Sequence, residues 1–364
     1  MRARLRNERS SATFPQQRAH DVALSCTRTG EPTTKGFDAD PFEQKLSRFT
    51  TLTRQHLATA VMPQGDFSHD NGGEPVRGIW LAAPKTTDSL FFALCSPVEG
   101  LWMHRVSGAL MDTAVRGSAI SAGFIVTHKA ALELDIDPEE FDIVEPRYTK
   151  IGGGISVPLL QITDHLVNGA GFCKRLASPA GDGIPLIRQL VRSIVSEYEA
   201  YPLKDYRNAK TEHAKRCDQS CYLCLQRYGN QAYHGLLDWR LGLSFLEAMN
   251  DPSFACGLDG NFSTPSLIDW PENAEKYGRD MVDRFNRGKG EWKRIGPVTA
   301  FRFDTKQRRW AIVAHPLWDF DNPGKLLRDV IKELKAVNPL RASTFDLARR
   351  PVTVRERLIS EWKH

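Results

Sequence analysis

The chain has 364 residues, of which 41% are apolar and 26% are charged, and its formal net charge is +5. Such a chain can bury a sizeable core, and its length suggests two domains. It has neither the run of about 18 apolar residues that a membrane-spanning helix needs nor an apolar N-terminal signal segment. Its seven cysteines are an odd number, so we expect thiols in the cytoplasm rather than a disulfide framework.

The first 54 residues differ in composition from the rest. Residues 1–50 hold nine Lys or Arg against six Asp or Glu, and they are rich in Arg, Ser, Thr, Pro and Gln. We find no apolar period of 2 or 3.6 residues in them. The sequence therefore predicts a basic, mostly disordered tail over residues 1–54.

A packed domain is predicted over residues 55–256, because helix and strand patterns alternate there. In chain order we expect strands at 78–81 and 89–94, a helix at 112–134, a strand at 157–164, a turn at 168–171 followed by a short helix, and helices at 184–201 and 236–249. The helix at 184–201 has one apolar stripe, whereas the helix at 236–249 is apolar nearly all round and should be buried.

The remaining residues are predicted to form a linker and a second unit. Residues 257–296 are polar with Gly and Pro, which favours a linker with one helix at most. Residues 297–364 should form a small α/β unit, with a hairpin from 298–304 and 309–314 and an amphipathic helix at 324–337. The predicted fold class is α/β (α+β), a mixed sheet and packed helices around a structural zinc site.

Three cysteines, Cys217, Cys221 and Cys224, lie within eight residues. Zinc prefers thiolate and imidazole ligands in a tetrahedron, and a Cys-x2-Cys step in a tight turn brings two sulfurs to one ion. Cys217 is close enough in sequence to add a third thiolate. The spacing therefore predicts one structural zinc ion, with a fourth ligand from elsewhere in the chain.

Four residues are candidates for the fourth ligand: Cys173, His213, His234 and Cys256. We favour Cys173, because it opens a helix just after a glycine turn, where backbone amides and the positive helix end stabilise a thiolate. His234, ten residues after Cys224, is the second choice. Three alternatives stay open: buried thiols without a metal, a redox pair at Cys221 and Cys224, and an iron–sulfur cluster with the same ligands.

Residues 60–256 resemble the MrfA-type zinc-binding domain family. The resemblance is carried by the cysteine motif, by Tyr228, Asn230, His234 and Leu237-Asp-Trp-Arg-Leu241 after it, and by Asp164 with Asn168-Gly-Ala-Gly-Phe-Cys173 before it. The family closes the C-terminal end of superfamily-two DNA helicases and occurs in phage-defence proteins similar to DISARM. The resemblance implies a zinc site of four thiolates, carried over to Cys173, Cys217, Cys221 and Cys224.

One departure from those helicases is decisive. The sequence contains no Gly-x4-Gly-Lys-Ser/Thr loop to bind ATP phosphates, so we expect no nucleotide cofactor. The helicase should be another chain, or this chain is a piece of a longer one. The resemblance therefore implies a non-catalytic accessory protein in DNA repair, another DNA-processing complex or phage defence.

The segment around the cysteines is the best candidate DNA-contacting surface. We predict phosphate contacts from Lys210, Lys215, Arg216 and Arg227, and base stacking from Tyr228. An ordinary solvated basic face is an equally good interpretation. A protein-recruitment module without DNA binding is a further alternative.

Two other patterns have weaker chemical interpretations. Asp164 with the glycine turn at 168–171 could bind a phosphate, although a tight turn is favoured. His315 and Asp319 follow a predicted strand and suggest a nuclease in the C-terminal unit, although His315 more commonly would cap or pack the hairpin. No convincing catalytic constellation supports an enzyme.

Overall fold

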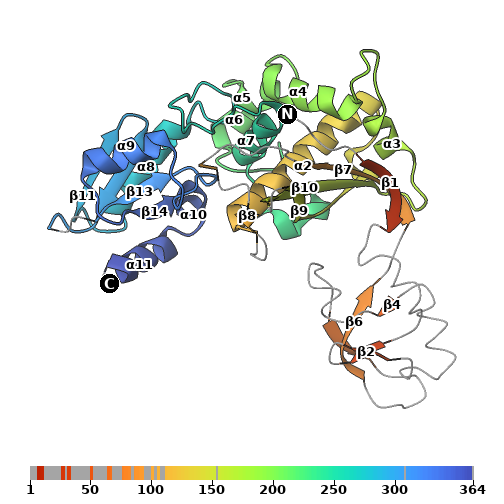
Figure 1. Ribbon diagram of the computed structural model, residues 1–364, viewed down its shortest axis with the longest axis horizontal. Coiled ribbons are helices and arrows are strands. Elements are labelled where there is room, and N and C mark those ends of the chain that lie inside the picture. Colours follow the sequence, from red (N-terminus) through yellow and green to blue (C-terminus); the bar gives the residue numbers. More distant parts are fainter. Residues whose placement is uncertain are drawn as a thin grey trace.

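The computed structural model describes residues 6–11, 26–28, 31–33, 50–51, 64–67, 76–82, 86–93, 100–101, 105–106, 111–152, 155–306 and 309–362 (Figure 1). Most of the predicted tail, residues 1–54, lies outside these ranges. Its described residues form four strands: β1 (Arg6–Ser11), β2 (Cys26–Arg28), β3 (Glu31–Thr33) and β4 (Thr50–Thr51). β1 pairs with a strand of the central sheet, so this part of the predicted tail takes part in the fold.

The central sheet has five strands and is antiparallel. β1 pairs with β7 (Thr86–Ala93), β7 with β10 (Ile155–Asp164), and β10 with both β8 (Arg105–Val106) and β9 (Phe141–Gly152). In two smaller, separate sheets, β2 pairs with β3, and β6 (Val76–Ala82) pairs with β4 and with β5 (Gln64–Phe67). The strands predicted at 78–81, 89–94 and 157–164 are therefore confirmed.

Helix α2 (Thr113–Leu134) lies between this sheet and helix α7 (Trp239–Asn250). The Asp112 side chain caps its N-terminus by accepting a hydrogen bond from the backbone amide of Ala114. α2 is buried on nearly all sides because its residues are small or apolar all round. A Cβ on Gly242 of α7 would lie 2.9 Å from the Ser121 Cβ of α2, so this glycine permits close helix packing.

Short helices surround this three-layer core. They are the 3-10 helix η2 (Pro138–Glu140), α3 (Phe172–Ala177), α4 (Leu186–Ser196), α5 (Leu203–Arg207), α6 (Glu212–Arg216) and the 3-10 helix η3 (Tyr228–Tyr233). α4 buries the apolar stripe that its sequence predicts, against α7 and α2. It ends at Ser196, earlier than the predicted residue 201, and Glu197 is its extended C-cap.

The C-terminal unit is built on a second sheet of four strands. Its order is β11 (Glu291–Ile295), β12 (Val298–Arg302), β13 (Ala311–Ala314) and β14 (Leu340–Ser343), with β13 and β14 parallel and the other pairs antiparallel. Its helices are α8 (Trp270–Asp283), α9 (Lys325–Leu334), α10 (Thr344–Arg349) and α11 (Pro351–Trp362). The predicted hairpin and the predicted amphipathic helix, now α9, are both confirmed.

The sequence predicts a linker over 257–296, and the structure differs there. α8 packs against β12, and β11 is a strand of the second sheet. The reason is that the segment's apolar residues are spaced to cover that sheet: Leu267, Trp270, Ala274, Met281 and Val282 are all buried. Most of this segment therefore belongs to the C-terminal unit.

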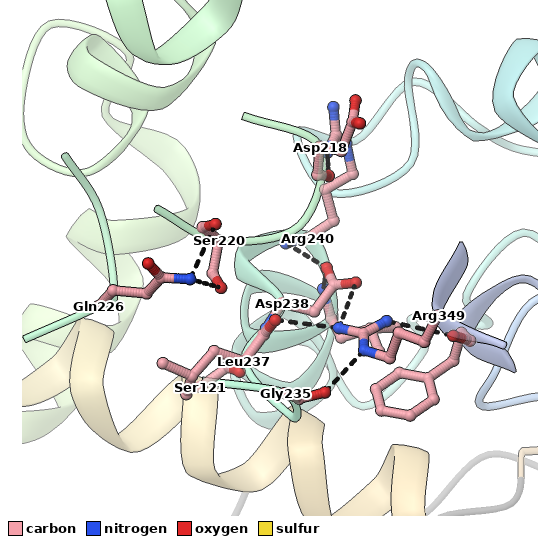
Figure 2. Close-up of polar contacts among 11 residues, drawn as sticks. Ser121, Asp218, Ser220, Gln226, Gly235, Leu237, Asp238, Arg240 and Arg349 are labelled. Atoms are coloured by element: carbon pink, nitrogen blue, oxygen red, sulfur yellow. Dashed lines mark hydrogen bonds and ion pairs between the residues drawn. The ribbon is translucent and has the colours of Figure 1, made fainter. Parts of the chain in front are cut away.

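Arg349 of α10 joins the two units (Figure 2). Its guanidinium donates to the carbonyls of Gly235 and Leu237, at 2.8 and 3.0 Å, and lies 3.6 Å from the carboxylate of Asp238, the N-cap of α7. A buried Trp318 indole also donates to the Cys256 carbonyl, at 2.8 Å. The two units therefore share polar contacts as well as one continuous hydrophobic core.

This mixed α/β architecture with two sheets is the predicted fold class. Within the described ranges, no helix combines the length and the apolar character that crossing a membrane would require.

Candidate metal centre

Helix α6 brings one histidine and one cysteine to the same face. Thr211 caps the helix by accepting from the Ala214 amide, at 3.2 Å, and the amide of Cys217 donates to the His213 carbonyl, at 2.9 Å. His213 and Cys217 are therefore one helical turn apart, a spacing that points their side chains in the same direction.

A tight turn supplies the other two cysteines. The Cys224 and Gln226 amides both donate to the Cys221 carbonyl, at 3.0 Å each. The same fold of the chain lets the Cys221 amide donate to the Cys224 sulfur, at 3.1 Å. This is the Cys-x2-Cys turn that the sequence predicts, and its amide stabilises negative charge on the sulfur.

The four residues converge on one point. One ligand atom from each of His213, Cys217, Cys221 and Cys224 lies within 4.8 Å of all the others. The Cys224 sulfur is 3.8 Å from that of Cys217 and 3.9 Å from that of Cys221. Thiolates bound to zinc at ~2.3 Å in a tetrahedron would be ~3.8 Å apart, whereas a disulfide would bring two sulfurs to ~2.0 Å. The spacing therefore fits a metal site.

His213 gives independent support for a ligand. It is only 3% exposed, yet neither ring nitrogen has a hydrogen-bond partner in the described structure. Its ring stacks on Tyr206, with centroids 4.9 Å apart, and meets Trp239 edge-on at 5.5 Å. A buried imidazole held by two aromatic rings and left without a partner is costly unless it coordinates something.

The cluster favours one thiolate even without a metal. A hydrogen bond from the Cys217 thiol lowers the pKa of Cys224 to about 4, and His213 acts in the same direction. The same contact and burial raise the pKa of Cys217, and burial raises the pKa of Cys221. A bound cation would reverse the last two shifts, because metal ligation requires thiolates.

Cys173, the favoured fourth ligand, is not part of this group. Its buried thiol contacts the Ile162 carbonyl, at 3.5 Å. The amides of the turn and of α3 are occupied by Asp164, whose carboxylate accepts hydrogen bonds from the backbone of Ala170, Gly171, Phe172 and Cys173 at 2.8–3.1 Å. Burial and the Asp164 carboxylate raise the pKa of the Cys173 thiol, so it has no stabilised thiolate.

The same contacts bear on the weaker phosphate interpretation. The amides that would bind a phosphate hold the Asp164 carboxylate instead. Gly169 in this turn has φ +78°, and a Cβ there would lie 2.5 Å from the Asp88 carboxylate. The glycine pattern therefore serves a tight turn that packs against β7, as the sequence favours.

The other two candidates for the fourth ligand also lie outside the group. The Nε2 atom of His234 contacts the Arg227 carbonyl and the Asn230 side-chain oxygen, at 3.0 Å each, and so braces the loop after the cysteines. Cys256 is buried beside His315, with its sulfur 3.2 Å from Nδ1 of that ring. Sequence reasoning named His213 but ranked Cys173 above it; the one-turn spacing from His213 to Cys217 was the signal that favoured the histidine.

The predicted DNA-contacting residues divide into two sets. Lys210, Lys215 and Arg216 are exposed on and before α6, the helix that carries His213. Arg227 instead turns its guanidinium to the Gln226 carbonyl, at 2.8 Å, and to His128 Nδ1, at 3.3 Å. Tyr228 is 86% exposed, and both Arg227 and Tyr228 line a cavity beside the metal loop.

The residues of the nuclease alternative are buried. His315 is 2% and Asp319 5% exposed. Burial lowers the pKa of His315 to about 3, so its ring is neutral at physiological pH. The Asp319 carboxylate accepts from the amides of Asp321 and Asn322, at 2.9 and 3.2 Å. Both residues pack and cap the loop after β13, and no observation here favours nuclease chemistry.

No protein-family model and no curated protein matches the chain. Among solved structures, the chain is similar to the crystal structure of the DUF1998 helicase MrfA bound to DNA, with 10% sequence identity and a TM-score of 0.28. The match covers 68% of this chain and 25% of that chain, so the match spans about a quarter of the helicase chain's length. A likeness of this size is distant and carries no structural argument.

Proposed function

We propose that this chain is a zinc-binding, non-catalytic accessory protein that contacts DNA and works with a helicase in DNA processing or phage defence. One observation carries the proposal: α6 supplies a metal ligand on its inner face and exposed cations on its outer face. The metal would therefore hold in place the helix that meets the phosphates.

Zinc suits the donor set better than other metals. Three cysteines and one histidine form a common closed structural zinc site, whereas iron–sulfur clusters usually take four cysteines. His213 replaces Cys173 in our assignment of the fourth ligand. Bound zinc would stabilise the loop from His213 to His234, because structural zinc sites contribute ~10–16 kcal/mol of apparent binding free energy to folding.

The proposed DNA contacts are Lys210, Lys215 and Arg216. Glu212 pairs with Lys215 at 2.9 Å and with Arg216 at 3.4 Å. All three side chains are more than half exposed, and such pairs contribute little, so phosphates can compete for both cations. We omit Arg227 and Tyr228 from this surface, because the cavity that they line carries more negative than positive charge.

The helicase partner rests on the sequence resemblance alone. The cysteine motif and the residues after it resemble a domain found at the end of DNA helicases, and this sequence lacks the ATP-binding loop of such motors. The motor would therefore lie outside these residues.

The test combines metal analysis with DNA binding. Elemental analysis of the intact protein should find one zinc per chain, and a Cys224→Ser variant should have none. Fluorescence anisotropy with labelled single-stranded and duplex DNA should show affinity that falls as salt rises. Changing Lys210, Lys215 and Arg216 together to Gln should reduce the slope of log affinity against log salt by about 2–3.

A matched control removes the same charge elsewhere. Changing the exposed Lys325, Lys332 and Lys335 of the C-terminal unit to Gln should leave that slope unchanged. If the protein contains zinc but does not bind DNA, the result would instead support a protein-recruitment module without DNA binding. Absence of any metal would remove its basis.

A further inference from the structure

A cavity of about 480 Å³ lies beside the metal loop. Its walls come from α2, from η2 and the start of β9, from His165 after β10, and from the loop between Cys224 and Tyr233. Its volume is in the range of ~300–1,000 Å³ found for small-ligand sites. Cys224 of the candidate metal site lies in one wall, and none of the proposed DNA contacts Lys210, Lys215 and Arg216 lines the cavity.

The charge on the walls is negative. Three carboxylates line the cavity, from Asp137, Glu139 and Asp142, against one guanidinium, from Arg227. Counting only these carboxylates and the guanidinium, the net charge is −2. The Arg227 guanidinium contacts the Gln226 carbonyl and His128, while Asp142 lies 3.1 Å from His165 Nδ1. A phosphate would be repelled, and a cation would be attracted.

Aromatic rings complete the walls. Phe124 and Tyr233 lie with ring centroids 6.4 Å apart, and Tyr228 stands at the edge with 86% of its surface exposed. Asn230 holds that edge in place, because its side chain accepts from the Arg227 amide at 2.8 Å and donates to the Leu225 carbonyl at 2.9 Å. Ring faces beside carboxylates attract ammonium and guanidinium groups by cation–π interaction.

The surroundings of the cavity indicate a protein as the source of the cation. Ten large apolar side chains are prominently exposed in the described structure; one of them, Tyr228, lines this cavity, and four more are within two residues in sequence of the lining residues His165 and Cys224. These five are Leu166, Val167, Tyr222, Leu223 and Tyr228. Exposed apolar residues close to polar groups are typical of protein-interaction sites.

We propose that this cavity binds a lysine or arginine side chain of a protein partner, and that the partner also contacts Tyr228 and the exposed apolar residues next in sequence to the cavity walls. The proposal does not depend on DNA binding. Charge complementarity selects the basic side chain, and Tyr228 contacts the partner beside it.

The test uses capped amino acids on the zinc-loaded full chain. Saturation-transfer NMR should detect binding of N-acetyl-arginine methylamide and N-acetyl-lysine methylamide, weakened by added salt. N-acetyl-norleucine methylamide has the apolar stem without the charge and should bind at least fivefold more weakly. Cytidine, a probe for nucleobase binding, should bind no more tightly than the norleucine derivative. Spermidine, a free polyamine, should bind no more tightly than the arginine derivative.

Matched variants locate the binding. Glu139→Gln and Tyr228→Ala should each weaken binding of the arginine derivative at least fivefold. Glu133→Gln and Tyr198→Ala change an exposed carboxylate and an exposed tyrosine away from the cavity and should have no effect. Zinc content and circular dichroism establish that each variant is folded.

Four outcomes would overturn the proposal. These are no detectable binding of either cation, equal binding of norleucine, tighter binding of cytidine or spermidine, and equal effects of the cavity and control variants. The cavity variants should leave the salt slope of DNA binding unchanged, so this proposal and the DNA proposal can fail separately.

Discussion

Two regions of the molecule place cysteine beside histidine, and they differ in what that pair can do. At the metal centre, one histidine and three cysteines converge, and the imidazole nitrogens have no other partner. In the core, the Cys256 sulfur lies 3.2 Å from His315, and the Trp270 and Trp318 rings lie 6.0 and 6.2 Å from that imidazole. The first arrangement offers four ligands to an ion, whereas the second offers two.

Electrostatics separates the two regions further. At the metal centre, neighbours lower the pKa of Cys224 to about 4, so a thiolate is present at neutral pH. In the core, burial raises the pKa of Cys256 and lowers that of His315, so both groups stay neutral. Number of ligands and electrostatic environment, rather than residue type, therefore decide which pair can bind a metal.

Cysteine substitutions should show the largest difference between the metal centre and the core pair. Cys224→Ser should abolish metal binding and destabilise the protein by at least ~3 kcal/mol, because the loop loses its ion. Cys256→Ser should keep one metal per chain and cost only ~1–2 kcal/mol of packing. Elemental analysis and denaturant unfolding measure both effects. Equal metal content in the two variants would contradict our assignment.

Histidine substitutions test the fourth ligand. His213→Ala should weaken zinc affinity more than ~100-fold, because groups that merely support a ligand already cost ~10–100-fold. His234→Gln should leave affinity nearly unchanged, since that ring bonds to loop oxygens. Competition with a chromophoric chelator gives both affinities. A larger effect of Cys173→Ser than of His213→Ala would restore the original choice.

A pH-dependent effect sharpens the picture of the Cys256–His315 pair. Burial raises the pKa of Glu247, near Cys256, from 4.5 to about 7. The folded chain then holds this proton more tightly than the unfolded chain, so its stabilisation is full below pH 4.5 and is lost as pH rises through 7. His315 acts oppositely, since its low pKa of about 3 removes stability as pH falls below 6.5.

Glu247→Gln separates these two contributions. The stability of this variant, relative to the unchanged protein, should rise by up to about 3 kcal/mol between pH 4.5 and 7. Denaturant unfolding at several pH values measures the difference, and acid release of the metal cancels because both proteins share it. A difference that does not change with pH would show that Glu247 is ionised in the folded chain.

Local spacing made much of the metal site predictable. Cys217, Cys221 and Cys224 lie within eight residues, so no knowledge of the tertiary fold was needed to group them. The fourth ligand could not be predicted in this way, because the Asp164 carboxylate and a Cys173 thiolate compete for the same backbone amides. Asp164 takes the amides that would have favoured a Cys173 thiolate, and sequence alone does not reveal which group wins.

In the fold, too, elements with a strong local pattern were predictable, whereas elements that depend on distant contacts were not. Strong periodicity correctly predicted α4 and the hairpin of β12 and β13. The segment 257–296 was harder, because Trp270, Met281 and Val282 are few among polar residues and become a core face only when α8 meets β12. The parallel partner β14 likewise depends on a contact distant in sequence.

The Arg349 junction has a mechanical consequence. The Arg349 guanidinium donates to the Gly235 and Leu237 carbonyls and faces Asp238, the N-cap of α7 (Figure 2). Arg240 of α7 donates to the carbonyl of Asp218, the residue after Cys217 of the candidate metal site. A force that pulls the C-terminal unit away would load the three Arg349 contacts together, because one guanidinium makes all of them. The junction should therefore resist shear, and tension on the C-terminal unit would be transmitted to the metal loop.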